Sequence, residues 1–279
     1  MKQIFICLLT AVLLSSCGSV PLTGRKQLLL VSDSEMLSLS LTQYQSYMKS
    51  ATPSTDKTSA AMVTRVGQNI ANAVEKYLKE NGFENEIANF AWEFTLVKDN
   101  TANAFCMPGG KIVVYEGILP FTKTEAGLAT VVAHEVAHAV AKHSSEQVSQ
   151  QMGISAGSQV VGIAASGQTE LAQAVIQSMY GLTSQGLLLL PYSRKMEYEA
   201  DHLGLIFMAM AGYNPEESIT FWERMSSGTS SGSDMLSTHP SDEKRIKQLK
   251  GRMPEALKYY TGTKSTTTPT TGKGFKLVY

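Results

Sequence analysis

The sequence has few cysteines and no excess of charge of either sign. Its 279 residues include 3 cysteines, and 24 basic residues balance 24 acidic ones, so the formal net charge is zero. A balanced charge gives no reason to expect nucleic acid as a partner, because phosphate backbones select strongly basic surfaces. With 43% hydrophobic residues, the chain has an ordinary globular composition. It is long enough for one good-sized domain or two small ones.

Hydrophobic runs long enough to cross a membrane are also missing. Residues 4–14 are apolar but too short to span a bilayer in the mature protein. With Lys2 ahead of them, they are typical of a signal peptide over residues 1–16. The peptide ends in Leu-Ser-Ser before Cys17, which resembles a bacterial lipobox, so we expect Cys17 to be lipidated. Gly18 then suggests, by the same resemblance, a lipid-anchored protein of the bacterial cell envelope, in the outer membrane and facing the periplasm.

The scarcity of cysteine also excludes an intramolecular disulfide from the mature chain. Cys7 lies in the signal peptide and Cys17 would carry lipid, which leaves Cys106 without a partner. We therefore expect Cys106 to be a small core residue rather than a nucleophile.

Residues 134–138 read His-Glu-Val-Ala-His, the pattern H-E-x-x-H. On an α-helix, residues four apart lie on one face, so His134 and His138 can both direct a ring nitrogen at one metal ion. Glu135, about 100° further round the helix, is near enough to reach a water on that metal. Two histidines and an adjacent carboxylate supply two ligands and a general base, the parts of a zinc hydrolase.

The flanking residues predict that this pattern is helical. Thr124 is a suitable N-cap, and Glu125 places negative charge in the first turn. Apolar residues follow at helical spacing: Leu128, Val131, Val132, Val136 and Ala139. The alternative is a buried helix whose two histidines bond to backbone groups, since short motifs recur by chance.

A small antiparallel sheet is expected directly before this helix. Residues 91–97 are aromatic and β-branched, residues 111–115 form a returning strand, and Pro-Gly-Gly at 108–110 marks a turn. An edge strand beside a metal site offers backbone groups to which an extended peptide can pair. We therefore expect a protein or peptide substrate to bind along four residues ahead of the turn: Asn103, Ala104, Phe105 and Cys106.

A catalytic zinc needs a third protein ligand and an open position. Three histidines remain in the chain: His143, His202 and His239. His143 follows the motif by five residues, with no glycine turn to bring it back. Glu197 and Asp201 share a face of a predicted helix, so one can bind the metal while the other accepts the N–H of a ligand histidine. Glu199 is expected on the opposite, solvated side.

These motifs resemble the gluzincin metallopeptidase family that contains HtpX, the CAAX prenyl protease and BepA. The resemblance covers about residues 32–253 and rests on H-E-V-A-H, E-x-x-A-D from Glu197, Asn-Ala-Phe at 103–105, Pro-Gly-Gly at 108–110 and Thr-His-Pro at 238–240. It implies a mostly helical α+β fold, a thermolysin-like minimal metallopeptidase domain. It also implies one Zn²⁺ per chain on His134, His138 and Glu197, with Glu135 as the base. The chain differs from HtpX and the prenyl protease by lacking transmembrane helices, and it is too short for the tetratricopeptide domain of BepA.

His239 is expected to have two roles. The oxyanion formed during peptide hydrolysis needs a stabiliser besides zinc, and His239, followed by a stiff proline, is the candidate. Because neutral imidazole is a good zinc ligand, His239 could also fill the open position in the resting enzyme. The alternative is a surface histidine beside a proline turn.

The expected organisation is a signal peptide over residues 1–16, a tether over 17–31, a zinc metallopeptidase domain over 32–255 and a Thr-rich, disordered tail over 256–279. Residues 153–190 fit a lid, an element lying on a membrane surface or two ordinary packed helices.

The predicted function is a zinc endopeptidase that acts on exposed or misfolded envelope proteins as quality control. A chaperone or adaptor that binds extended chains in the same groove is the main alternative, although binding alone would not need Glu135. A structural zinc lipoprotein is the third possibility, and an open coordination position argues against it. The sequence indicates neither the substrate nor the oligomeric state.

Overall fold

The structure is a computed structural model that describes residues 17–158, 182–183, 186–187, 192–227, 235, 239 and 243–262. The predicted signal peptide lies outside the described residues, as do most of the undecided stretch 153–190 and the loop after residue 227. Thr238, Pro240 and most of the Thr-rich tail also lie outside them.

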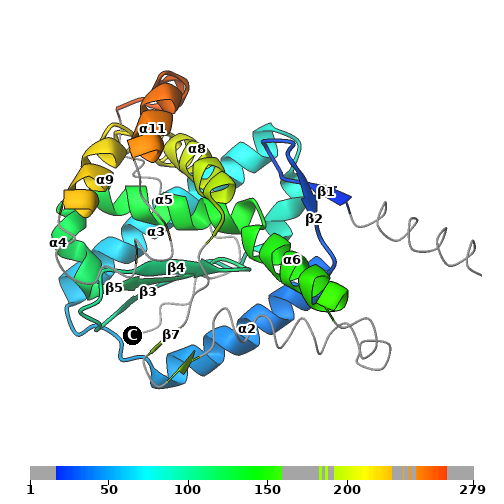
Figure 1. The fold of residues 1–279 in the computed structure, drawn as a ribbon. Helices are drawn as coiled ribbons and strands as arrows, with labels where there is room; N and C mark the ends of the chain where they lie inside the picture. The colour runs from blue at the N-terminus through cyan, green and yellow to red at the C-terminus, as the bar shows by residue number, and fades with distance from the viewer. Residues whose placement is uncertain are drawn as a thin grey trace, which may run out of the picture.

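The described chain is mostly helical (Figure 1). Its longer helices are α2 (Asp33–Ser50), α3 (Lys57–Glu80), α5 (Glu125–Val140), α6 (His143–Ser158), α8 (Arg194–Met210), α9 (Glu217–Ser227) and α11 (Glu243–Ala256). Shorter turns are η1 (Glu84–Asn89), η2 (Glu116–Ile118), α4 (Leu119–Thr122) and η3 (Leu257–Tyr259). The strands are β1 (Cys17–Ser19), β2 (Lys26–Leu28), β3 (Glu93–Val97), β4 (Ala104–Met107), β5 (Lys111–Tyr115), β6 (Leu182–Thr183) and β7 (Gly186–Leu187). The expected mostly helical α+β class is confirmed, and the thermolysin-like arrangement stays a prediction.

Two helix starts follow the capping residues predicted from the sequence. Ser32 caps α2 in a capping box: its side chain accepts the N–H of Glu35, whose carboxylate accepts the N–H of Ser32 at 3.2 Å. Thr124 caps α5 by accepting the N–H of Gly127 at 3.0 Å. Each cap satisfies a backbone donor that the helix itself leaves unpaired.

The central sheet differs from the antiparallel sheet that was expected. Its order is β3-β5-β4, with β4 antiparallel to β5 but β3 parallel to β5. The chain reverses twice between β3 and β5, and β5 then inserts between the other two strands instead of adding outside β4. β5 is suited to the centre because Ile112, Val113 and Val114 are fully buried. β4, which holds most of the predicted substrate-binding residues, therefore lies at an edge of the sheet.

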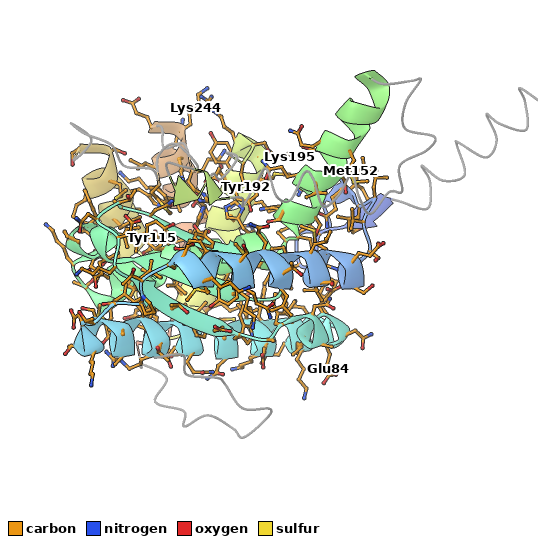
Figure 2. The ribbon with its side chains drawn as sticks, turned by 90° about the horizontal axis from the view of Figure 1, so that it is seen from below. Glu84, Tyr115, Met152, Tyr192, Lys195 and Lys244 are labelled. Carbon is orange, nitrogen blue, oxygen red and sulfur yellow. The ribbon has the colours of Figure 1, made fainter. Side chains whose placement is uncertain are left out.

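The two faces of the sheet pack on different helices. Phe105 and Val113 point toward α2, where Tyr47 meets Phe105 edge-to-face at 5.4 Å between ring centroids. Cys106 and Ile112 alternate to the other face and join the larger core with α3 and α5. Figure 2 shows the strands between α2 and α3, and β4 is the strand that lies along α5 in Figure 1.

Helix α8 lies unusually close to α5 because of one glycine. A Cβ atom on Gly204 would lie 3.2 Å from the backbone nitrogen of His134, tighter than ordinary contacts. The missing side chain lets the two backbones approach where α5 carries its histidines. Glu197 lies two turns earlier on α8, so this close approach also brings Glu197 to the histidines of α5.

The N-terminal segment packs on the domain, which differs from the tether expected over residues 17–31. β1 and β2 form an antiparallel hairpin, and Val20 between them is 1% exposed in the main core. Among the described residues, no helix combines the length and the apolar character that a bilayer crossing requires.

Candidate active site

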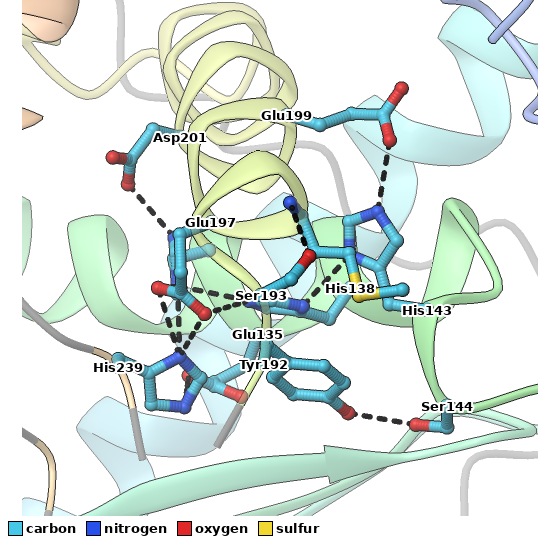
Figure 3. Close-up of polar contacts among 12 residues, drawn as sticks. Glu135, His138, His143, Ser144, Tyr192, Ser193, Glu197, Glu199, Asp201 and His239 are labelled. Atoms are coloured by element: carbon cyan, nitrogen blue, oxygen red, sulfur yellow. Dashed lines mark hydrogen bonds and ion pairs between the residues drawn. The ribbon is translucent and has the colours of Figure 1, made fainter. Parts of the chain in front are cut away.

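Helices α5 and α8 and the residue His239 bring four possible metal ligands together. One ligand atom from each of His134, His138, Glu197 and His239 lies within 4.8 Å of the others, and all four residues are buried. The two α5 histidines approach each other at 3.1 Å between their Nε2 atoms. His239 Nδ1 lies 3.2 Å from His134 Nε2 and 3.0 Å from a Glu197 oxygen. The three predicted metal ligands and His239 thus share one centre, and Figure 3 shows His138, Glu197 and His239 there.

The outer nitrogens of the two α5 histidines fix their tautomers. Nδ1 of His134 lies 3.0 Å from Asp201 Oδ1, and Nδ1 of His138 lies 2.9 Å from Nδ1 of His143. When each Nδ1 carries the donated hydrogen, both Nε2 atoms present lone pairs to each other beside the Glu197 carboxylate. Such an arrangement is repulsive unless a cation lies between the atoms. This donor set fits Zn²⁺, which binds histidine nitrogen and carboxylate oxygen.

The charges around the centre also favour a cation. Burial and Arg245 lower the pKa of His134, but hydrogen bonds to Asp201 and Glu197 outweigh them and raise this pKa to about 9. Without a metal ion, a proton on Nε2 would therefore take the place of the cation. Burial holds the pKa of His138 well below its ordinary value, so this ring is neutral. Burial alone would raise the pKa of Glu197, but His239 and Arg245 outweigh burial and hold this pKa well below the ordinary range.

Glu135 points into the same centre from α5 (Figure 3). Its side chain is buried, its Oε1 has no hydrogen-bond partner among the described residues, and this oxygen lies 3.4 Å from His239 Nε2. Burial raises the pKa of Glu135 above its ordinary value. A carboxylate with a raised pKa and an unused acceptor is suited to take a proton from water.

Asp201 is held by an arginine that sequence reasoning missed. Arg245, on α11, donates from Nε to Asp201 Oδ2 and from Nη2 to Asp201 Oδ1, both at 2.7 Å. Its Nη1 lies 3.1 Å from Glu197 Oε2, and its guanidinium lies 3.5 Å from the centre of the Trp222 ring. The fully buried Arg245 therefore ties α11 to two carboxylates of the centre. Arg245 and Asp201 are 44 residues apart in the sequence, so no local sequence pattern linked them.

Replacing Asp201 by asparagine is expected to weaken zinc binding by about 10–100-fold, the usual cost of losing a group that supports a ligand. An amide cannot accept from His134 and twice from Arg245, because its NH₂ group donates instead. Titration with a zinc chelator measures the dissociation constant, with the exposed Asp99→Asn as the matched control. An unchanged constant would reduce Asp201 to a packing role.

Two further residues lie closer to the site than the sequence indicated. His143, expected not to be the third ligand, is absent from the four converging ligands, but it lies against His138 because α5 ends at Val140 and Lys142 takes a left-handed φ of 56°. Glu199, expected to be solvated, is 9% exposed and accepts from His143 Nε2 at 3.0 Å. Both faces of α8 are covered, so helical periodicity alone could not locate Glu199. Tyr192 stacks on His138 at 4.1 Å between ring centroids, which no sequence motif indicated.

The predicted substrate-binding residues lie beside this centre. Among the described strands, β4 pairs with β5 alone, and the Tyr115 N–H donates to Asn103 O. From this register, the backbone groups of Ala104 and Cys106 point away from β5. The Ala104 N–H is taken by the Asn103 side chain at 2.9 Å. Burial raises the pKa of Cys106 well above its ordinary value, which agrees with a core thiol rather than a nucleophile.

Comparison with known proteins assigns the family. The model of peptidase family M48 matches residues 65–253, more than half of the chain. The mitochondrial metalloendopeptidase OMA1 of Schizosaccharomyces pombe is 42% identical over 186 residues, which are 66% of this chain and 53% of that protein. Human OMA1 is 29% identical over 248 residues, 85% of this chain and 46% of the relative.

The β-barrel assembly-enhancing protease of Escherichia coli is 28% identical over 171 residues, 58% of this chain and 34% of that protein. The predicted resemblance to BepA is thus confirmed in part. The chain spans about half, or less, of the length of these curated relatives.

The predicted location in the bacterial outer membrane is contradicted by the same comparison. Relatives at 42%, 39% and 35% identity are mitochondrial metalloendopeptidases by name, whereas the bacterial relatives match at 31% and 28%. The location rested on a few residues around Cys17, and short motifs recur by chance. Lipidation of Cys17, the first described residue, stays a prediction.

The predicted enzyme class, a zinc metallopeptidase, is confirmed by the family match together with the cluster of three histidines and a glutamate. The chain belongs to peptidase family M48.

Proposed function

We propose that the protein is a zinc-dependent endopeptidase that hydrolyses peptide bonds in exposed or misfolded segments of other proteins. The observation that carries this proposal is the meeting of four buried metal-binding side chains with a carboxylate oxygen of Glu135 that has no hydrogen-bond donor within the described part of the chain. A structural zinc site would not need such a group. The relatives are named metalloendopeptidases and proteases, which supports the same activity.

His134, His138 and Glu197 would hold the zinc ion. Bound zinc supplies Lewis-acid polarisation of the scissile carbonyl and lowers the pKa of water toward about 7. Glu135 accepts the proton of the attacking water and returns it to the leaving amine. Asp201 keeps His134 in the tautomer that leaves its Nε2 unprotonated, and Arg245 holds Asp201.

An extended peptide would bind along β4. After the Asn103 side chain has taken the Ala104 N–H, the Ala104 carbonyl and both backbone groups of Cys106 still point to the outer edge. Both residues are buried, so a peptide would first have to displace what covers them. Pairing through these groups recognises backbone rather than sequence, which suits a protease for unfolded segments. Compact folded proteins would be poor substrates because their strands are already paired.

His239 would first occupy and later leave the position that water needs. With His239 in place the centre would have four protein ligands, a closed arrangement. The Met235 N–H donates to Ala102 O at 3.1 Å, and the His239 N–H donates to Met235 O at 2.8 Å. The segment that carries His239 is thus bonded to the chain just ahead of β4, where a substrate strand would enter. Entry would displace His239, which then stabilises the oxyanion.

His239→Ala is expected to lower turnover by about 10²–10³-fold, the typical loss for a missing oxyanion stabiliser. The same variant should lose zinc faster to a small chelator, because one ligand no longer covers the ion. Steady-state cleavage of unfolded casein and chelator kinetics measure the two effects, and His202→Ala, a partly buried histidine paired with Glu255, is the control. Turnover above that of the wild type would mean that His239 only restrains, and wild-type behaviour in both assays would remove both roles.

One observation favours the alternative, a chaperone or adaptor that binds extended chains with little proteolysis. His239 as a fourth ligand would close the centre, and a closed centre can hold structure without hydrolysing anything. The two functions differ in their products, because only a protease creates new chain ends.

The test is mass spectrometry of an unfolded protein extract incubated with zinc-loaded wild type and with Glu135→Gln. A peptidase produces new peptide termini with wild type alone. Equal capture of extended proteins by both forms, without new termini, would favour the adaptor.

A further inference from the structure

The metal ligand His138 lies at the start of a buried chain of contacts that leads away from the metal centre. A histidine five positions later on a continuous helix would point to a different face. Here α5 ends, Lys142 turns the backbone, and α6 starts at His143. Lys142 is held in that turn by Asp33 at 2.7 Å and Glu86 at 2.9 Å. The break in the helix therefore presents His143 to His138.

The hydrogen positions along this chain are determined by its two ends. Metal binding by Nε2 of His138 leaves the hydrogen on its Nδ1, which donates to His143 Nδ1 at 2.9 Å. His143 must then carry its hydrogen on Nε2, which donates to Glu199 Oε2 at 3.0 Å. The carboxylate of Glu199 thus acts on His138 through one intervening imidazole (Figure 3).

Glu199 is in turn held by the N-terminal hairpin. Arg25, which directly precedes β2, donates from Nε to Glu199 Oε2 at 2.6 Å, and the Thr23 hydroxyl donates to Glu199 Oε1. The two other guanidinium nitrogens of Arg25 form a paired contact with Glu146 on α6, at 3.0 and 2.6 Å. The side chains of Arg25, Glu146 and Glu199 are 13%, 8% and 7% exposed. Arg25 therefore joins Glu199 of α8 to Glu146 of α6, the helix that begins at His143.

We propose that Arg25 is a positioning residue for the metal ligand His138, acting through Glu199 and His143. The N-terminal hairpin is by this inference part of the metal centre. The inference rests on the proposed function, because it takes His138 to be a zinc ligand. The planar guanidinium fixes both carboxylates at once, which a point charge on a flexible stem cannot do. Without Arg25, Glu199 and Glu146 would repel each other, and the His143 ring would lose its fixed acceptor.

The test compares zinc dissociation constants of purified Arg25→Gln and wild-type protein, measured by chelator competition. Arg25→Gln is expected to bind zinc about tenfold more weakly, near the lower end of the cost of losing a supporting group. Arg25→Lys should recover part of that loss. Arg65→Gln is the matched control, because Arg65 pairs with Glu125 on α5 but its side chain is 53% exposed. The thermal stability of each metal-free protein is measured alongside.

Double variants separate positioning from general stability. If Arg25 acts through Glu199, Arg25→Gln adds little to the loss of zinc affinity already caused by Glu199→Gln. Combined with Asp201→Asn, which supports His134 instead, it should add its full effect. If Arg25→Gln fails to fold, Thr23→Val removes a single donor to Glu199 and should weaken zinc binding in the same direction.

The outcomes distinguish this inference from the proposed function. A lower melting temperature of metal-free Arg25→Gln with wild-type zinc affinity would overturn the inference and leave the proposed function standing. Additive losses in Arg25→Gln with Glu199→Gln would also overturn it. A wild-type protein that binds no zinc would overturn the proposed function, and the inference with it.

Discussion

Glu135→Gln is expected to lower the turnover of an unfolded protein substrate by about 10²–10⁴-fold, the range for a lost acid–base group. The amide keeps the shape of the side chain but cannot accept the proton of water. Zinc should remain bound, because Glu135 is not among the four converging ligands. The raised pKa of Glu135, caused by burial, brings the carboxylate closer to the pH at which it must exchange protons.

The control for this prediction is Glu125→Gln, in the first turn of the same helix, where the side chain pairs with the exposed Arg65. It makes the same chemical change outside the centre and should keep wild-type turnover. Zinc content is measured for both proteins. Glu135→Gln that keeps zinc and wild-type turnover would assign the base to another residue.

Glu197→Ala is expected to abolish zinc retention, a larger loss than the about 10–100-fold cost of removing a supporting group. The carboxylate is 1% exposed, lies within 3.4 Å of both α5 histidines and balances the buried Arg245 at 3.1 Å. Without it, two histidines would face a guanidinium that Asp201 alone balances. Metal analysis after dialysis is expected to find about one zinc per wild-type chain and almost none in the variant.

Glu223→Ala is the control for that loss, because Glu223 is half exposed and pairs only loosely with Lys250 at 3.6 Å. Circular dichroism of both variants separates loss of metal from loss of fold. Full zinc occupancy in folded Glu197→Ala would exclude Glu197 as a ligand.

The parts of the site that follow local rules could be predicted from the sequence. Thr124 caps α5 as expected, and the four-residue spacing of His134 and His138 places both rings on one face. The same spacing brings Glu197 and Asp201 to that centre from α8. Each of these inferences needs only helix geometry within a few turns.

The parts that depend on tertiary packing could not be predicted. Periodicity placed Glu199 in solvent because it cannot show that the N-terminal hairpin covers the outer side of α8. Arg245 meets its partners from more than 40 residues away in sequence, and nothing around it marks a buried cation. The left-handed backbone conformation at Lys142 is adopted by a residue other than glycine, so the sequence did not indicate a turn there. The parallel pairing of β3 with β5 arises because β5 lies at the centre of the sheet. Which strand lies at the centre depends on tertiary packing, which the sequence pattern does not show.

The central claim is that this centre hydrolyses peptide bonds, and one measurement tests it most directly. Zinc-loaded protein is incubated with unfolded casein in water enriched in heavy oxygen, and the peptides are analysed by mass spectrometry. The account predicts new C-termini that carry the heavy isotope in the wild type and not in Glu135→Gln. Intact casein after incubation with fully zinc-loaded wild type would contradict the account and indicate a binding protein instead.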